Sequence, residues 1–446
     1  MTALRALRVQ AAAAVALAAL SLLVLPGAPT YDPFAWIIWG REITEGALVT
    51  TAGPSWKPLP VAITTVLALT GSASPWLWLI VARAGALGAL VAIAALVRRL
   101  GGGWAGAAAA VVAVGLAPWW GFQALLGNSE GLMVLCVAAS LERLLAGQHR
   151  TALLLGAGAA LLRPEAWPFL GLYGVWLLAR RQVRPAVVVG VGLGVLACWT
   201  MPEWWGSGDP LRAASRARTD IGSSAPTNAD HPLLATVGDA IDLLSIPVLV
   251  ALAAAMVAAA RGRDRVAGGL LALGAAWLLV VAVMTSGGFS GNERYLFVPV
   301  VLLIVVAAAW LGAALQAVPA AVAVPLCVVV FAIPSAGRLP GVHDRAAYEA
   351  QMTWALPDVI DGAGGAAFVR GCGVVSTGRF LVPQVAWFLH LHQRQVSQFA
   401  RAPGTVFGVR TTATSRWGPP RGAISPRPVA TDRAWRVYQR CAEGRP

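Results

Sequence analysis

Residues 295–314 read YLFVPVVLLIVVAAAWLGAA, an apolar run without a single charged side chain. At about 1.5 Å per residue, a helix of this length crosses the roughly 30 Å hydrocarbon core of a bilayer. Comparable runs recur through the first three quarters of the chain, so we expect a polytopic membrane protein of about eleven transmembrane helices. The expected spans lie near residues 9–25, 75–97, 104–118, 130–146, 151–163, 165–180, 185–203, 240–260, 266–285, 295–314 and 317–334.

The composition agrees with lipid as the main solvent. Of the 446 residues, 58% are hydrophobic and 12% are charged, whereas a soluble domain carries about 25% charged residues. The formal charge of +14 comes almost entirely from arginine, since Lys57 is the sole lysine. The arginines lie mostly in short loops and the tail, without the interleaved aromatic residues of a nucleic-acid surface, so we expect no nucleic-acid partner.

The distribution of basic residues in the short loops predicts the orientation. Basic loops alternate along the chain with loops that carry little net charge; the basic ones lie near 97–99, 142–150, 180–184 and 261–265. Basic loops remain in the cytoplasm. We therefore expect a multi-pass plasma-membrane protein with a cytoplasmic N-terminus. Arg5 and Arg8 before the first apolar run are also typical of a signal peptide, but a clean cleavage site is missing.

Two parts are expected. Residues 1–334 form an all-α membrane domain with a first outer loop at 26–74, and residues 335–446 form a small extracytoplasmic α/β domain. Helices are predicted in the tail at 346–360 and 383–392, strands at 373–376, 405–410 and 434–439, and a loop at 416–427. Cys372 and Cys441 form a disulfide or remain free thiols, and the sequence leaves both open.

The first outer loop contains Tyr31-Asp32-Pro33 and continues to Glu42. We expect an aromatic-rich amphipathic helix from 33 to 42 in the headgroup layer, and a second interfacial helix from 59 to 69. The Asp32 carboxylate suits a helix cap as well as a general base that activates a hydroxyl. The Lys57 ammonium suits a snorkelling anchor as well as a phosphate contact.

Further polar residues fall on the same expected outer face: Glu130, Arg163, Glu165, Arg294 and Tyr295. Charges beside hydrocarbon are costly, so they face a cavity or pair with one another. A purely structural set of ion pairs, Glu130 with Arg163 and Arg294 with Glu165, is one interpretation. We favour a substrate site, because these residues converge with Asp32 and Lys57 on one side.

The segment Arg294-Tyr295-Leu296 with Pro299 resembles the Arg-Tyr-Leu-x-x-Pro segment of bacterial GT-C membrane glycosyltransferases of the RgtA/B/C/D-like and dolichyl-phosphate-mannose type. The long first loop with an early acidic residue and the outer C-terminal domain resemble the same superfamily. The resemblance implies inverting transfer of a hexose or pentose from a polyprenyl-phosphate donor, with Asp32 as base and Arg294 near the donor phosphate. Because Lys57, Arg163 and Glu165 lie on the same expected outer face, we also expect them to contact the substrate.

The acceptor is left open among a cell-envelope glycan, lipid or protein. Many relatives have a second acid where Pro33 stands, which leaves a divalent metal open, although no Cys/His spacing typical of a metal site exists. Two other functions remain alternatives. A lipid-linked sugar flippase or transporter needs polar groups near the bilayer midplane, and a non-catalytic membrane scaffold would use the tail to bind envelope partners.

Overall fold

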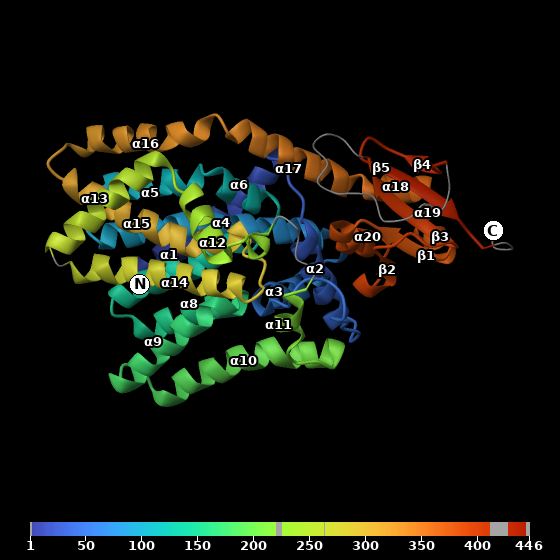
Figure 1. Ribbon diagram of the computed structural model, residues 1–446, viewed down its shortest axis with the longest axis horizontal. Coiled ribbons are helices and arrows are strands. Elements are labelled where there is room, and N and C mark those ends of the chain that lie inside the picture. The colour runs from blue at the N-terminus through green and yellow to red at the C-terminus, as the bar shows by residue number, and fades with distance from the viewer. Residues whose placement is uncertain (1, 220–224, 263, 411–426, 443–446) are drawn as a thin grey trace.

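The computed structural model describes residues 2–219, 225–262, 264–410 and 427–442. A bundle of helices fills most of the molecule, and a small α/β unit formed by the C-terminal residues lies at one end of it (Figure 1). Helices α2 and α3, which come from the first loop, lie between these two parts.

The helices of the membrane part alternate with short connections. They are α1 Thr2–Val24, α2 Tyr31–Thr44, α3 Pro58–Ala68, α4 Ser74–Arg99, α5 Gly103–Gly115, α6 Pro118–Leu125, α7 Glu130–Leu145, α8 His149–Leu162, α9 Trp167–Ala179, α10 Pro185–Ser207, α11 Arg212–Arg216, α12 Pro232–Asp242, α13 Ile246–Gly262, α14 Arg265–Ser286, α15 Phe297–Ala314 and α16 Ala320–Ala336. Short 3-10 turns include η2 Pro164–Ala166 and η4 Glu293–Leu296. Both turns carry residues expected at the site.

The expected eleven spans are not confirmed. Among the residues that the structure describes, four helices are long and apolar enough to cross a membrane, and seven spans result if each bent helix pair counts as one. Several expected spans are too short by themselves: α8 has 14 residues, about 21 Å of helix. Glycine, proline and polar residues interrupt the apolar runs, and hydropathy alone does not register those breaks.

The C-terminal unit has helices α17 Leu339–Trp354, α18 Leu356–Gly362, α19 Gly365–Gly371 and α20 Val382–Phe388, and strands β1 Val374–Thr377, β2 Val396–Ser397, β3 Gly404–Val409, β4 Ala430–Thr431 and β5 Trp435–Arg440. The strand order is β2-β1-β3-β5-β4, with β1 parallel to β2 and β3 and the other pairs antiparallel. The predicted strands appear as β1, β3 and β5, whereas residues 416–426 of the predicted loop lie outside the described residues. A disulfide joins Cys372 and Cys441.

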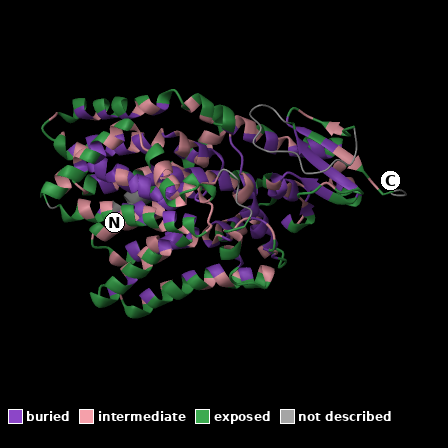
Figure 2. Cartoon of the chain, viewed as in Figure 1, coloured by how far each residue is buried: buried purple, intermediate pink, exposed green. Residues whose placement is uncertain are grey.

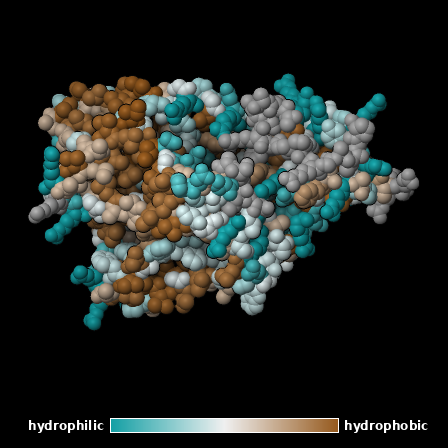
Figure 3. All heavy atoms as spheres, in the orientation of Figure 1, coloured by the Kyte–Doolittle hydropathy of each residue, from teal (hydrophilic) through white to brown (hydrophobic). Residues whose placement is uncertain are grey.

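Burial separates inner from outer helices. Helix α15 is mostly buried, while α10 and α16 show largely exposed apolar faces (Figure 2). In the view of Figure 3, hydrophobic residues cover the helical part and hydrophilic ones the C-terminal end. Exposed Leu193, Leu196 and Ile333 fit a lipid-facing surface, since such apolar area is unusual in water.

The helices that contain the expected site residues cross their neighbours at close distance. A Cβ at Gly131 would lie 2.7 Å from Ala86 Cα, so the missing side chain lets α7 approach α4. A Cβ at Gly40 would lie 2.5 Å from the carbonyl carbon of Thr64, which allows α2 to cross α3 in direct contact. Small residues at crossings are typical of membrane bundles, where helices gain stability from close packing.

Helix α2 does not lie on the surface as expected. Residues 33–42 are all buried, and Trp36 and Trp39 are fully inaccessible. The helix packs between α3, α4 and α20, so its aromatic residues join the core instead of facing headgroups. The expectation failed because hydrophobicity on nearly all sides of a helix is also typical of a buried helix.

Candidate functional site

One end of the bundle gathers the ionic residues from five segments. Asp32 lies in the first turn of α2 and Lys57 directly precedes α3. Glu130 begins α7, Arg163 follows the last residue of α8, and Arg294 lies in η4 before α15. The basic residues at 98–99 and 143 lie at the other ends of α4 and α7. The two sets of loops separated in the sequence analysis therefore occupy opposite ends of the bundle.

Asp32 interacts with two cations, Arg294 and Lys57. Its Oδ2 accepts a hydrogen bond from Arg294 Nη2 at 3.2 Å and lies 4.0 Å from Lys57 Nζ. Asp32 is not the helix cap, because Thr30 occupies that position and α2 begins at Tyr31. Lys57 is not a snorkelling anchor either: its side chain is 12% exposed, and its ammonium lies 4.9 Å from the Trp36 ring centroid.

The network continues with charges that alternate in sign. Arg294 Nη1 lies 3.9 Å from Glu130 Oε1, and Arg163 forms an ion pair with the same oxygen. Arg163 Nη1 also lies 3.8 Å from Glu165 Oε1, and its guanidinium stacks 4.5 Å above the Tyr295 ring. The expected pair of Glu130 with Arg163 is therefore present, but Arg294 pairs with Asp32 and Glu130, not with Glu165.

Sequence reasoning missed the residue that fixes the second amino group of Arg294. Asn128 Oδ1 accepts from Arg294 Nη1 at 3.2 Å, and Asn128 Nδ2 donates to Gln123 Oε1 at 2.7 Å. Asn128 is 5% exposed. Its position beside Glu130 in a polar loop was the only available signal. The contact between residues 128 and 294 depends on tertiary packing.

The network has no net charge, but some of its polar atoms lack hydrogen-bond partners. It contains three cations and three carboxylates, and among the described side-chain atoms Glu130 Oε2, Glu165 Oε2 and Arg163 Nε lack a hydrogen-bond partner. Buried polar atoms without partners cost about 1–3 kcal/mol each. Such unsatisfied atoms suit a site that rearranges around a polar ligand.

The pKa values follow from burial and neighbouring charge. Burial raises the pKa of Asp32, but the guanidinium of Arg294 and the ammonium of Lys57 more than offset it, so the net shift is downward. Burial, with help from Arg163, lowers the pKa of Lys57 to about 8, although Asp32 and Glu130 oppose the shift. The pair is therefore ionised at neutral pH, with Lys57 near its titration range.

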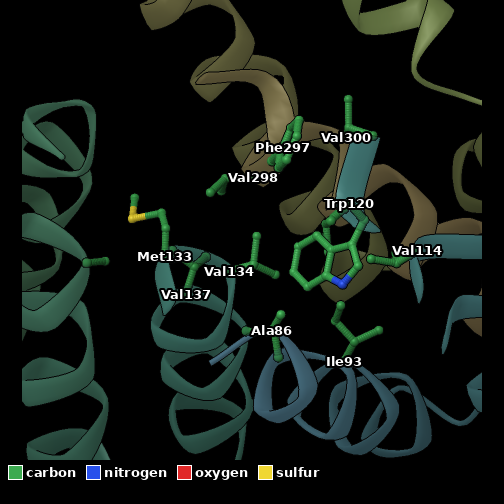
Figure 4. Packing of buried hydrophobic residues seen from close by; sticks show 14 of the residues in the cluster. Ala86, Ile93, Val114, Trp120, Met133, Val134, Val137, Phe297, Val298 and Val300 are labelled. Atoms are coloured by element: carbon green, nitrogen blue, oxygen red, sulfur yellow. The ribbon is translucent and has the colours of Figure 1, made fainter. Parts of the chain in front are cut away.

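The space at Glu130 is small. A cavity of about 10 Å³ lies between Glu130, Arg163, Arg294 and Tyr295, enough for about one water molecule. Met133, Phe297 and Val298 line it from the apolar side, and Figure 4 shows them in one cluster of buried hydrophobic residues with Trp120 and Val134. A phosphate-sized group therefore requires the network to open.

The carboxylates do not form a metal site. In the described ranges, no group of three or more His, Cys, Asp or Glu side chains is arranged to hold a metal ion. Asp32, Glu130 and Glu165 each lie against an arginine, and a cation would have to displace those guanidinium groups. The donor set does not fit a divalent metal, and we assign no chemical step to one.

The architecture is that of a multi-pass membrane protein with the GT-C fold. The crystal structure of ArnT from Cupriavidus metallidurans bound to undecaprenyl phosphate matches it with a TM-score of 0.60 at 15% sequence identity. The match covers 97% of this chain and 97% of ArnT, so it includes the membrane part and the C-terminal unit. No protein-family model matches the chain, and no curated protein matches its sequence.

Proposed function

We propose that this chain is a membrane glycosyltransferase that moves a sugar from a polyprenyl-phosphate donor to a cell-envelope acceptor on the non-cytoplasmic face. The observation that carries the proposal is the convergence of Asp32, Lys57 and Arg294 within one ionic network. A carboxylate beside two cations suits a reaction that takes a proton from a hydroxyl and releases a phosphate. ArnT, which has the same fold, is bound to undecaprenyl phosphate in its structure.

In the proposed reaction, Asp32 accepts the proton of the acceptor hydroxyl. The hydroxyl oxygen attacks the anomeric carbon, and the bond from that carbon to the phosphate oxygen breaks. The configuration at the anomeric carbon inverts. The polyprenyl phosphate takes the bonding electron pair, and the charges on Arg294 and Lys57 stabilise it. The donor is already activated, so the reaction needs no nucleotide.

The remaining site residues have supporting roles in this proposal. Glu130 and Asn128 hold the Arg294 guanidinium from two sides. Glu165 and the Tyr295 ring hold Arg163, which lies on the other side of Glu130. Once the network has opened and the donor phosphate is bound, guanidinium groups that are held by several partners need little further reorganisation as charge develops on the leaving phosphate.

The location of the ionic residues favours an enzyme over a transporter. A transporter site is expected near the bilayer midplane at interrupted helices, whereas this network lies where α7 begins and α8 ends. We place this end and the C-terminal domain outside the cytoplasm, since the basic loops lie at the opposite end and basic loops remain inside.

The test replaces Asp32 by asparagine, which keeps the shape and removes the base. In membranes from a strain lacking the chromosomal copy, we expect Asp32→Asn to reduce sugar transfer to envelope glycans by about 100-fold or more. Asp209→Asn serves as the control, because Asp209 is an exposed loop residue. Near-normal transfer by Asp32→Asn refutes the proposed role of Asp32 as the base. Equal transfer in membranes that lack the protein refutes the enzyme assignment, and donor lipid retained on the inner leaflet of the deletion strain supports transport instead.

A further inference from the structure

A second cleft lies between the first outer loop and the C-terminal domain. It has a volume of about 400 Å³, and its walls include Tyr31 and Gly53 from the loop, Arg216 at the end of α11, and Gln393, Arg394 and Phe399 from the C-terminal domain. Binding sites for small molecules usually measure about 300–1,000 Å³. The cleft is separate from the small cavity at Glu130.

The residues that line the cleft include a buried glutamine. The Gln393 side chain is 1% exposed, yet within the described part of the chain neither its Nε2 nor its Oε1 has a hydrogen-bond partner. An amide buried in this way costs roughly 1–3 kcal/mol. A ligand that both accepts and donates hydrogen bonds would recover that cost, and a sugar hydroxyl does both.

The surrounding chain holds Gln393 in place. The turn η6 Gln393–Gln395 is anchored by His392, whose Nδ1 lies 2.8 Å from the fully buried Glu42 Oε1. Arg41 Nη2 donates to the carbonyl of Leu391 at 2.8 Å. Gly53 has a φ of +90°, and a Cβ there would lie 2.4 Å from Gln393 Oε1. The buried amide is therefore a built feature of the contact between α2 and the C-terminal domain.

Aromatic side chains accompany the amide. Phe399, which is 50% exposed, and Tyr31 both line the cleft. The Tyr31 ring packs edge-on against Phe380 at 5.6 Å. The faces of such rings pack against the C–H groups of a sugar ring, while amides and hydroxyls bind its polar edge. Gln398 and Arg394 add polar groups at the exposed side.

The cleft adjoins the proposed base. Tyr31 and Asp32 are consecutive residues in the first turn of α2, so their Cα atoms are about 3.8 Å apart and their side chains diverge by about 100°. One side chain faces the cleft and the other faces Arg294 and Lys57. A ligand that lies against Tyr31 has a short path to the Asp32 carboxylate.

We propose that this cleft binds the acceptor, and that the acceptor is a saccharide held by Gln393, Tyr31 and Phe399. The inference rests on the proposed transferase activity and narrows its acceptor to carbohydrate. It also gives the C-terminal domain a function: it supplies one wall of the acceptor site, while the membrane part supplies the base and the donor contacts.

The main test uses Gln393→Leu, which keeps the size of the side chain and removes its hydrogen bonds. Oligosaccharides released from the envelope of a strain lacking the protein serve as acceptor at varied concentration, and lipid extracts of that strain supply the donor. We expect the acceptor KM to rise about 10-fold, with the donor KM unchanged. Gln351→Leu is the control, because Gln351 is exposed on α17.

Folding is controlled by two further measurements. Because Gln393→Leu removes an unpartnered buried amide, its thermal stability should equal or exceed that of the wild type. Phe399→Ala changes an exposed rim residue and should also raise the acceptor KM. If both variants leave the acceptor KM unchanged, or if they raise the donor KM instead, the acceptor assignment is wrong.

A binding assay separates this inference from the proposed reaction. End-labelled envelope oligosaccharides are titrated with purified protein and followed by fluorescence anisotropy. We expect Asp32→Asn to bind them like the wild type, and Gln393→Leu to bind about 10-fold more weakly. Equal binding by wild type and Gln393→Leu refutes the cleft assignment. Transfer retained by Asp32→Asn refutes the proposed reaction and leaves the binding result valid.

Discussion

The protonation of Lys57 provides a test of its proposed contact with the donor phosphate. The pKa of its ammonium is lowered to about 8, mainly by burial and further by Arg163, against the opposing charges of Asp32 and Glu130. In the proposed reaction Lys57 contacts the donor phosphate, and only the protonated amine has the charge to do so. Donor capture by the free enzyme should therefore weaken as the pH rises through about 8.

The magnitude follows from the titration. With a pKa of about 8, roughly nine in ten Lys57 side chains are charged at about pH 7 and roughly one in ten at about pH 9. The value of kcat/KM for the donor, which reports the free enzyme, should fall about 10-fold over this interval. A bound phosphate favours the charged amine, so the corresponding decline in kcat should shift to higher pH.

The assay measures sugar transfer at donor concentrations well below KM over this pH range, for the wild type and for Lys57→Arg. An arginine stays protonated throughout, so the variant should lose the decline near pH 8 even if its maximal rate is lower. Arg180→Lys is the control, because it introduces a lysine at an exposed loop position. If Lys57→Arg retains the same decline, another group titrates and the phosphate role of Lys57 is wrong.

Three further predictions concern stability and are measured by thermal unfolding of purified protein. Glu130→Gln should cost about 3–5 kcal/mol, because it removes the carboxylate charge that two largely buried arginines, Arg163 and Arg294, share. Glu142→Gln should cost less, since the arginines around Glu142 are more than a third exposed. Gly40→Ala should cost about 1–3 kcal/mol by forcing α2 away from α3, whereas Gly190→Ala, with nothing within 4 Å, should be neutral or stabilising. Cys372→Ser should cost about 2–4 kcal/mol, because the disulfide closes a sequence separation of 69 residues; equal stability with and without reductant in the wild type would contradict this.

The fold and the convergence of the candidate site residues at one end of the bundle could be predicted from the sequence for one physical reason. Charged residues are costly in lipid, so the chain confines them to the ends of helices, and the positions of the basic loops separate one end from the other. The ion pair between Glu130 and Arg163 could be predicted, because these residues lie at the start and at the end of one helical hairpin formed by α7 and α8. No comparable local rule connects Asp32 with Arg294, which are 262 positions apart.

The errors have the same origin. The helix from 33 to 42 was expected at the membrane surface, because sequence shows the chemistry of its side chains but not the elements that cover it. Gln393 was missed because its burial depends on packing against Gly53, which lies in a distant part of the chain. The contacts of the C-terminal domain with α2 are all long-range, so hydropathy and residue spacing do not predict them.

In the proposed reaction, the basicity of Asp32 depends on whether the donor phosphate is bound. Asp32 is held at a low pKa by Arg294 and Lys57, which makes it a weak base in the free protein. A donor phosphate that binds the same two cations competes with the carboxylate for them. When the cations turn to the phosphate, Asp32 loses the charges that depress its pKa, and its basicity rises toward that of an ordinary buried carboxylate. In the proposed reaction, donor binding therefore strengthens the base when an acceptor hydroxyl in the adjoining cleft can use it.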